Sequence, residues 1–134
     1  MMVRTILGLV AGVLVAVGLV FVLEMAGHMM FPPPADLNVR DPAQMATMIE
    51  RLPIGAVLAV LVAWTLGAFG GGFVAAMVAR RGAWPAWVVA GLLLVFSAMT
   101  MVMIPHPTWF MVAAVVLIAA AGWLAGRLGG KVAA

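Results

Sequence analysis

Four long runs of apolar residues divide the chain, and polar residues are concentrated in the stretches between them. The runs cover approximately residues 5–31, 53–79, 84–104 and 107–127, and the segment 32–52 is the one long connection between them. An α-helix rises about 1.5 Å per residue, so roughly 20 residues cross the hydrocarbon core of a bilayer. Each run is therefore long enough for one membrane crossing.

None of these runs alternates polar and apolar residues, which argues against a β-barrel. Helices are the other way to satisfy the backbone in lipid. The pattern therefore predicts an all-α, polytopic membrane four-helix bundle, built as a single transmembrane domain of residues 1–134. The connections after the second and third runs are short, so successive helices are expected to be antiparallel neighbours.

A short amphipathic helix is predicted within the outer loop, residues 32–52. The sequence Asp41-Pro42-Ala43-Gln44 has the form of a capping box, with proline in the first turn. Apolar residues then recur at helical spacing, at Met45, Met48, Ile49 and Leu52. We expect this helix to lie on the outer surface or to cap the bundle.

The composition supports a lipid environment. Hydrophobic residues make up 67% of the chain and charged residues 8%, whereas a soluble domain has about 25% charged residues. The absence of cysteine excludes a disulfide framework, thiolate metal sites and thiol redox chemistry in this chain. The basic residues are few and scattered, so the lipid bilayer is the expected partner and nucleic acid is not.

The basic residues also predict an orientation. One end of the predicted bundle carries five of them and no acidic residue: Arg4, Arg80, Arg81, Arg127 and Lys131. Lys and Arg accumulate on the cytoplasmic side of membranes, so both termini are expected there. Arginine outnumbers lysine six to one, and Ala, Gly and Val are abundant, which suits a GC-rich bacterial genome. We therefore expect a multi-pass protein of the bacterial inner (plasma) membrane.

Small residues at four-residue spacing are expected to hold the helices together, because hydrophobic burial does not drive association in lipid. The candidates for helix packing are Gly8, Gly12, Gly67, Gly71, Gly122 and Gly126. We expect first that these glycines pack helices of one bundle against each other, and second that they mediate self-association of the chain. On a straight helical projection, the side of Gly8 and Gly12 is turned well away from Glu24. This projection predicts two protein-facing sides for the first helix and a central place in the bundle.

A candidate polar cluster lies toward the outer end. Glu24 and His28 are one helical turn apart and share a face. The turn before the fourth helix contains His106, and Ser97 and Thr100 lie about 6–11 Å below the outer end of the third helix. We expect both hydroxyl groups to lie within reach of Glu24.

The depth of two side chains follows from their distance to the helix ends. Glu24 lies about 30 Å from Thr5, which predicts a position near the outer boundary of the membrane. Trp64 lies about 16 Å below Pro53, near the middle of the membrane. The projection places Val13, Val17 and Val20 beneath Glu24.

Three interpretations of the cluster stay open. In the structural one, Glu24 bonds His28, Ser97 or Thr100, with no further role. In the second, Glu24, His28 and His106 form a two-histidine, one-carboxylate site for Zn²⁺ or Fe²⁺. In the third, Glu24 or His28 changes its charge during proton or ion transport. No catalytic residue is predicted, because the sequence has neither a phosphate-binding loop nor a Ser–His–Asp spacing.

Two motifs carry a resemblance to a known group of proteins. Glu24-x-x-Gly27-His28-x-x-Phe31-Pro32-Pro33 and Pro105-His106-Pro107-x-Trp109 resemble a group of small bacterial four-span integral membrane proteins. The resemblance covers the whole length and implies the fold but no activity. We therefore expect a structural or accessory subunit of a membrane complex, or a homo-oligomer, and the residues favour a non-enzymatic role. The alternatives are a metal-dependent site at the outer face and a small ion or solute transporter.

Overall fold

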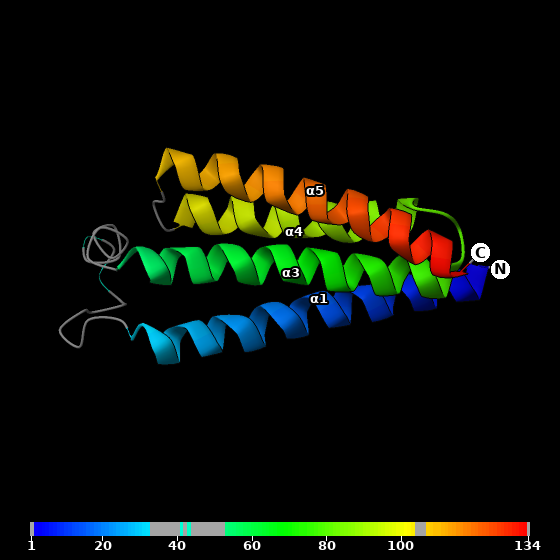
Figure 1. Cartoon of the computed structure of the whole chain (residues 1–134), viewed down its shortest axis with the longest axis horizontal. Helices are drawn as coiled ribbons and strands as arrows, with labels where there is room; N and C mark the ends of the chain where they lie inside the picture. The colour runs from blue at the N-terminus through cyan, green and yellow to red at the C-terminus, as the bar shows by residue number, and fades with distance from the viewer. Residues whose placement is uncertain (1, 33–40, 42, 44–52, 104–106, 134) are drawn as a thin grey trace.

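Four long helices make up the bundle. The computed structural model describes residues 2–32, 41, 43, 53–103 and 107–133. The helices are α1 (Met2–Met30), α3 (Ile54–Ala79), α4 (Trp84–Met103) and α5 (Thr108–Ala133) (Figure 1). Each of them is long and apolar enough to cross a membrane. The prediction of an all-α, polytopic membrane four-helix bundle is confirmed.

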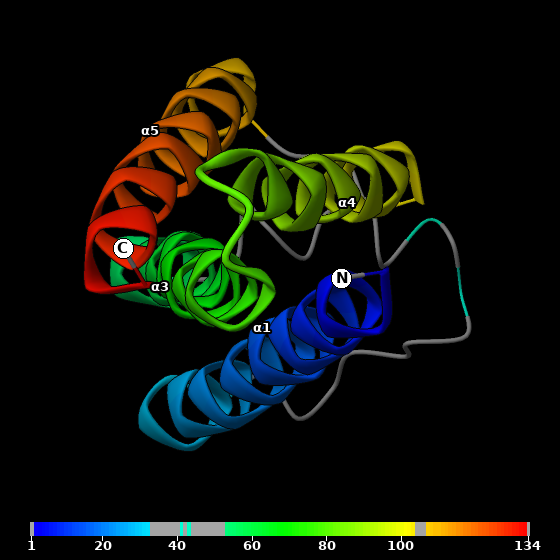
Figure 2. The same ribbon diagram turned by 90° about the vertical axis from the view of Figure 1, so that its right-hand side faces the viewer.

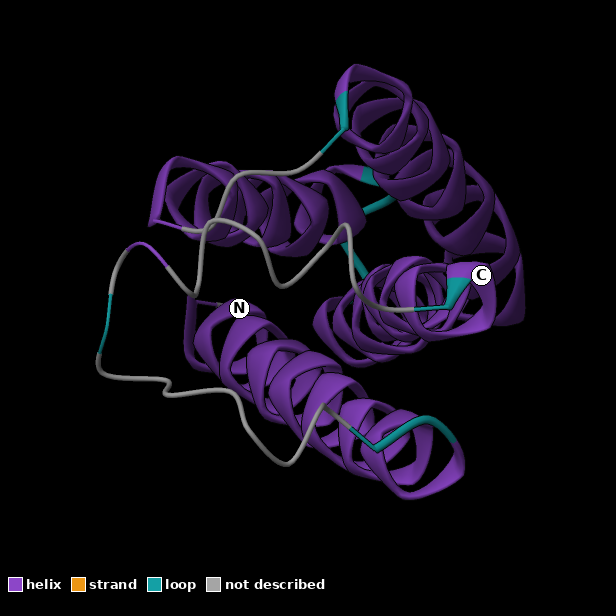
Figure 3. Ribbon diagram, turned by 90° about the vertical axis from the view of Figure 1, so that its left-hand side faces the viewer, coloured by secondary structure: helices purple, strands orange, loops and turns teal. Residues whose placement is uncertain are grey.

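The two ends of the bundle differ. Both chain termini lie at the same end of the bundle, which we call the inner end (Figure 1). Figure 3 looks at the opposite, outer end and shows no strand among the described residues. In the outer loop, the Asp41 side chain accepts a hydrogen bond of 3.0 Å from the backbone N–H of Ala43, as an N-cap residue does. The rest of the predicted amphipathic helix lies outside the described residues.

The central helix of the bundle is α3. It packs against each of the other three, whereas α1 packs mainly on α3 and only lightly on α4 (Figure 2). The expectation that the first helix is central is therefore wrong. The reason lies in the distribution of buried residues: small buried residues occur along the whole of α3, while α1 buries one row, Gly8, Gly12, Ala16 and Val20.

This row of α1 meets a matching row of α3. Every fourth residue of one helix faces every fourth residue of the other, in the pairs Gly8–Ala79, Gly12–Ala75, Ala16–Gly71 and Val20–Gly67. A Cβ atom added at Gly12 would lie 2.6 Å from the carbonyl oxygen of Gly71 and from the Cβ of Ala75. The two backbones thus approach closely because these side chains are absent or small.

The inclination of α1 explains how its row of buried residues, from Gly8 to Val20, stays in contact with α3. Rows at i, i+4 wind slowly around a helix, so they follow a second helix only when the two axes cross. Figures 1 and 2 show α1 inclined across α3. The next residue of the row is Glu24. A straight projection turns it away from Gly8, but in the inclined arrangement it reaches α3.

Glycines also lie where α5 contacts its neighbours. A Cβ atom added at Gly122 would lie 2.6 Å from the Cβ of Ala90, and one at Gly126 would lie 2.9 Å from the Cβ of Ala83. Both glycines therefore lie where α5 approaches the beginning and middle of α4.

At the inner end, a side chain of α1 completes the end of α3. The Arg4 guanidinium donates from Nε to the carbonyl oxygen of Val78 over 2.8 Å. This carbonyl belongs to the last turn of α3, where carbonyls lack partners within the helix and a positive charge is favourable. Arg80 then ends α3 in the left-handed conformation, with φ 52°, and its N–H bonds to the Ala76 carbonyl.

The close approach of α1 and α3 leads to a test with two substitutions in one helix. Gly12→Val is expected to lower the free energy of unfolding by about 1–3 kcal/mol, because the added carbons meet α3 backbone atoms. A Cβ atom at Gly18 meets nothing within 4 Å, so Gly18→Val is expected to change stability by less than about 0.5 kcal/mol. Unfolding in a denaturing-detergent titration measures both. Equal losses would contradict the assigned interface.

Candidate functional site

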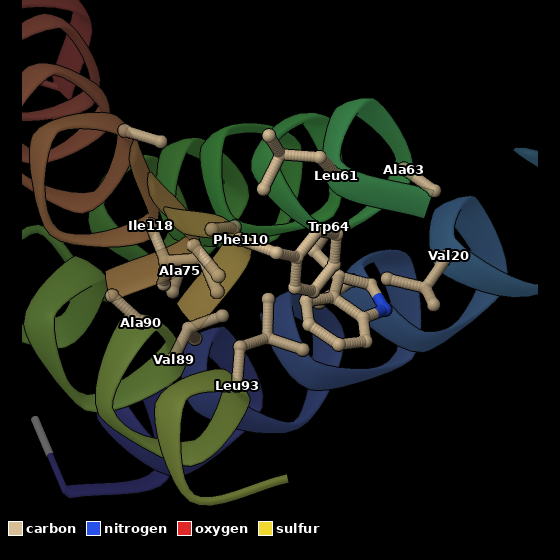
Figure 4. Close-up of a cluster of buried hydrophobic side chains, with 14 of the residues drawn as sticks. Val20, Leu61, Ala63, Trp64, Ala75, Val89, Ala90, Leu93, Phe110 and Ile118 are labelled. Atoms are coloured by element: carbon tan, nitrogen blue, oxygen red, sulfur yellow. The ribbon is translucent and has the colours of Figure 1, made fainter. Parts of the chain in front are cut away.

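Trp64 lies in the main cluster of buried side chains, which joins all four helices (Figure 4). Its side chain is 2% exposed. The indole meets the ring of Phe110 from α5 edge to face, with centroids 5.5 Å apart. In Figure 4 the indole nitrogen points toward α1, beside Val20. The apolar part of Trp64 therefore packs in the core, and its polar atom is presented to α1.

The indole N–H of Trp64 donates a hydrogen bond to Oε1 of Glu24, with Nε1 and Oε1 2.8 Å apart. In a helix, each Cα–Cβ bond tilts toward the N-terminus of that helix. Because α1 and α3 are antiparallel, Glu24 tilts toward the inner end and Trp64 toward the outer end. The two side chains therefore meet, although their positions along the chain suggested different depths.

The helix ends give the level of the Glu24 carboxyl group within the bundle. Glu24 is six residues before the end of α1 at Met30, which is about 9 Å. It borders the same crevice as Phe96, which lies about 10 Å below the end of α4 at Met103. Both helices thus place the carboxyl group about 10 Å below the outer end of the bundle.

An apolar crevice of about 270 Å³ lies between α1 and α4, and Glu24 is the one ionisable residue among the described residues of its lining. The α1 wall includes Val13, Val17, Val20 and Phe21, and the α4 wall consists of Val89, Leu92, Leu93 and Phe96. Val17, Phe21, Leu92 and Phe96 are also exposed on the surface of the bundle. The crevice thus opens sideways, toward the position of lipid.

A second hollow, of about 310 Å³, lies on the outer flank of α1. We call it the α1 hollow, and its lining is Phe21, Glu24, Met25, His28 and Met29. His28 is exposed and borders this hollow together with Glu24. No hydrogen bond or ion pair joins the two side chains in the part of the chain that the structure describes.

The two hydroxyl groups of the candidate cluster remain on their own helix. Ser97 donates to the Leu94 carbonyl over 2.9 Å, and Thr100 donates to the Phe96 carbonyl over 3.0 Å. Carbonyls three or four residues earlier are always within reach of such hydroxyls in a helix. The structure thus gives Glu24 a partner in Trp64, and not in Ser97 or Thr100.

The predicted metal site depends on a residue outside the described part of the chain. Glu24 and His28 share the α1 hollow, but the third predicted ligand, His106, lies among the residues that the structure does not describe. Within the described residues, no group of three His, Asp or Glu side chains could hold a metal ion. A Zn²⁺ or Fe²⁺ site on Glu24, His28 and His106 stays a prediction.

Comparison with known proteins places the chain in a family. A family profile described as "Methylamine utilisation protein MauE" matches residues 4–106, which include all but the first two residues of α1 and the whole of α3 and α4. The chain belongs to the MauE family. The match fits the predicted group of small membrane proteins, and no curated protein and no solved structure matches the chain.

The Glu24–Trp64 hydrogen bond of this MauE-family chain is testable by a double-mutant cycle. Trp64→Phe removes the donor and Glu24→Leu removes the acceptor, so the double variant is expected to lose less stability than the sum of the single losses. The expected coupling is about 1 kcal/mol, as for hydrogen bonds between membrane helices.

Unfolding in a denaturing-detergent titration measures the four proteins of the cycle. Glu24→Gln is the matched control, because its side-chain carbonyl still accepts a bond from the indole. Strictly additive losses in the cycle would show that the two side chains do not stabilise each other.

Proposed function

We propose that this chain is an accessory subunit of a membrane complex, bound to its partner through the outer third of α1. The family to which it belongs is named for methylamine utilisation, and we propose that the complex serves a pathway of that kind. The α1 hollow is the observation that carries the proposal.

The α1 hollow combines polar and adaptable side chains on an outward-facing flank. Ionisable residues within membrane spans almost always face protein or a water-filled cavity, because lipid does not solvate them. His28 is exposed on this chain, and Glu24 is partly exposed. Met29, which is 80% exposed, and Met25 provide flexible side chains that adapt to a partner surface. A partner helix over the hollow would supply the missing polar contacts.

The position of α1 suits this role. It is held by one row of small residues on α3 and lies at the edge of the bundle, so a partner can approach its opposite flank without displacing another helix. The exposed flank of α5 at comparable depth offers a contrast. It presents the apolar residues Met111, Val112, Val115 and Val116, which suit contact with lipid.

Site-specific photo-crosslinking tests the proposed partner surface. A photo-reactive residue at Met25 is expected to give a discrete crosslinked product in native membranes, because Met25 borders the α1 hollow. The same residue at Val112 of α5 is the control, expected to give crosslinks to lipid alone. Mass spectrometry identifies the product as another protein or a second copy of this chain. Equal lipid-only products at both positions would refute an accessory role through α1.

We propose that the protein lies in the bacterial inner membrane with both termini cytoplasmic. The support is that both termini lie at one end of the bundle in Figure 1, and that this end carries basic residues. Because the chain has no cysteine, single cysteines report topology cleanly. A cysteine at Ala43 is expected to react with an impermeant maleimide in whole spheroplasts, and one at Val132 only after lysis. The reverse pattern would overturn the orientation.

A further inference from the structure

We propose that the crevice between α1 and α4 binds an amphiphile with one slim hydrocarbon chain and a head group that donates a hydrogen bond to Glu24. The head group is a hydroxyl or an amine, and not a carboxylate or a phosphate. This site goes beyond the accessory role, because it concerns a small molecule in a different recess of the bundle.

The walls of the crevice select an apolar, narrow occupant. Apart from Glu24, every lining residue that the structure describes is aliphatic or aromatic, and the volume is about 270 Å³. Binding sites for drug-sized ligands measure roughly 300–1,000 Å³, so this crevice accommodates a single chain better than a bulky ring system. An apolar chain from the bilayer can enter sideways, past the exposed side chains of Val17 and Leu92.

Glu24 provides the polar recognition. Trp64 donates to its Oε1, which holds the carboxyl group at the edge of the crevice. Carboxylate oxygens offer about four acceptor positions, so the bond from the indole leaves acceptor capacity for a ligand. A hydroxyl or an ammonium group supplies the donor. A carboxylate or phosphate head brings further acceptors and negative charge, which makes an unfavourable pair with Glu24.

Trp64 itself can report occupancy by fluorescence quenching. The other four tryptophans, Trp84, Trp87, Trp109 and Trp123, are 44–49% exposed, so replacing them with phenylalanine leaves buried Trp64 as the single fluorophore. This protein is reconstituted into phosphatidylcholine vesicles. The probes are three brominated dodecyl chains that differ in the head group: amine, hydroxyl and carboxylate.

Saturable quenching of Trp64 is expected with the amine and hydroxyl probes. Their half-saturation is expected at a concentration about tenfold below that of the carboxylate probe, since these two probes donate a hydrogen bond to Glu24 and one hydrogen bond contributes about that factor. The ranking of amine against hydroxyl identifies the preferred head group. Quenching that is linear in probe concentration, or equal for all three heads, would overturn the proposal.

Two valine substitutions separate the crevice from the general lipid surface. Val17 and Val116 are each 58% exposed, but only Val17 lines the crevice. Val17→Phe is expected to abolish the saturable quenching, and Val116→Phe on α5 is expected to preserve it. The same quenching in both variants would place the probes elsewhere.

Glu24→Leu tests the head-group contact and is expected to remove the difference between the three probes. Thermal melting verifies that each variant is folded. Should Glu24→Leu fail to fold, the comparison of the two valine variants and the ranking of the three probes on the parent protein still decide the outcome. A folded Glu24→Leu variant that keeps the full discrimination would exclude Glu24 as the acceptor.

Discussion

The close approach of the α1 and α3 backbones determines much of this structure. Lipid surrounds such helices as favourably as leucine side chains do, so their association depends on van der Waals packing and on polar contacts. Gly12 and Gly71 lie where an added Cβ atom would collide with the facing backbone. The same approach inclines α1 and brings Glu24, the next residue of the row, against Trp64.

The Glu24–Trp64 bond links two regions of different character. On one side, Trp64 packs against Phe110 in a core that includes residues of all four helices. On the other side, Glu24 borders both the apolar crevice and the α1 hollow. A carboxyl group within a membrane span is costly unless a donor satisfies it. The buried indole supplies this donor and holds the carboxyl group at the junction of the two recesses.

The spans could be predicted from the sequence because length and hydropathy suffice to recognise a membrane helix. The partner of Glu24 could not be predicted in the same way, because it depends on the crossing of two helices. The sequence shows the four-residue spacing in each helix but not which residues face each other. Once the structure sets Val20 against Gly67, one further step leads from Glu24 to residue 63, which is adjacent to Trp64. A straight projection of α1 alone hides this relation.

The position of α1 in the bundle could not be predicted from a helical projection of that helix either. Its prediction considered the faces of the first helix, whereas the observed arrangement depends on how many faces of α3 carry small residues. The hydroxyls of Ser97 and Thr100 were expected to reach across to Glu24, but carbonyls of the same helix are nearer. Local geometry thus determined the bonding of these hydroxyls, and packing between helices determined that of Glu24.

The four-residue repeat of the α1–α3 contact has a consequence for folding. Each pair sets a glycine of one helix against an alanine or valine of the other, and a Cβ atom added at Gly67 or Gly71 would lie 2.6 Å from the side chain of Val20 or Ala16. A slide of one turn would bring Val20 against Ala63 or Ala16 against Ala75, so the packing itself opposes the slide. The bonds from Arg4 to the Val78 carbonyl and from Trp64 to Glu24 lie near opposite ends of this contact. A slide of one turn would break both. These two polar bonds therefore reinforce, near both ends of the contact, the alignment that the glycine–alanine and glycine–valine pairs select.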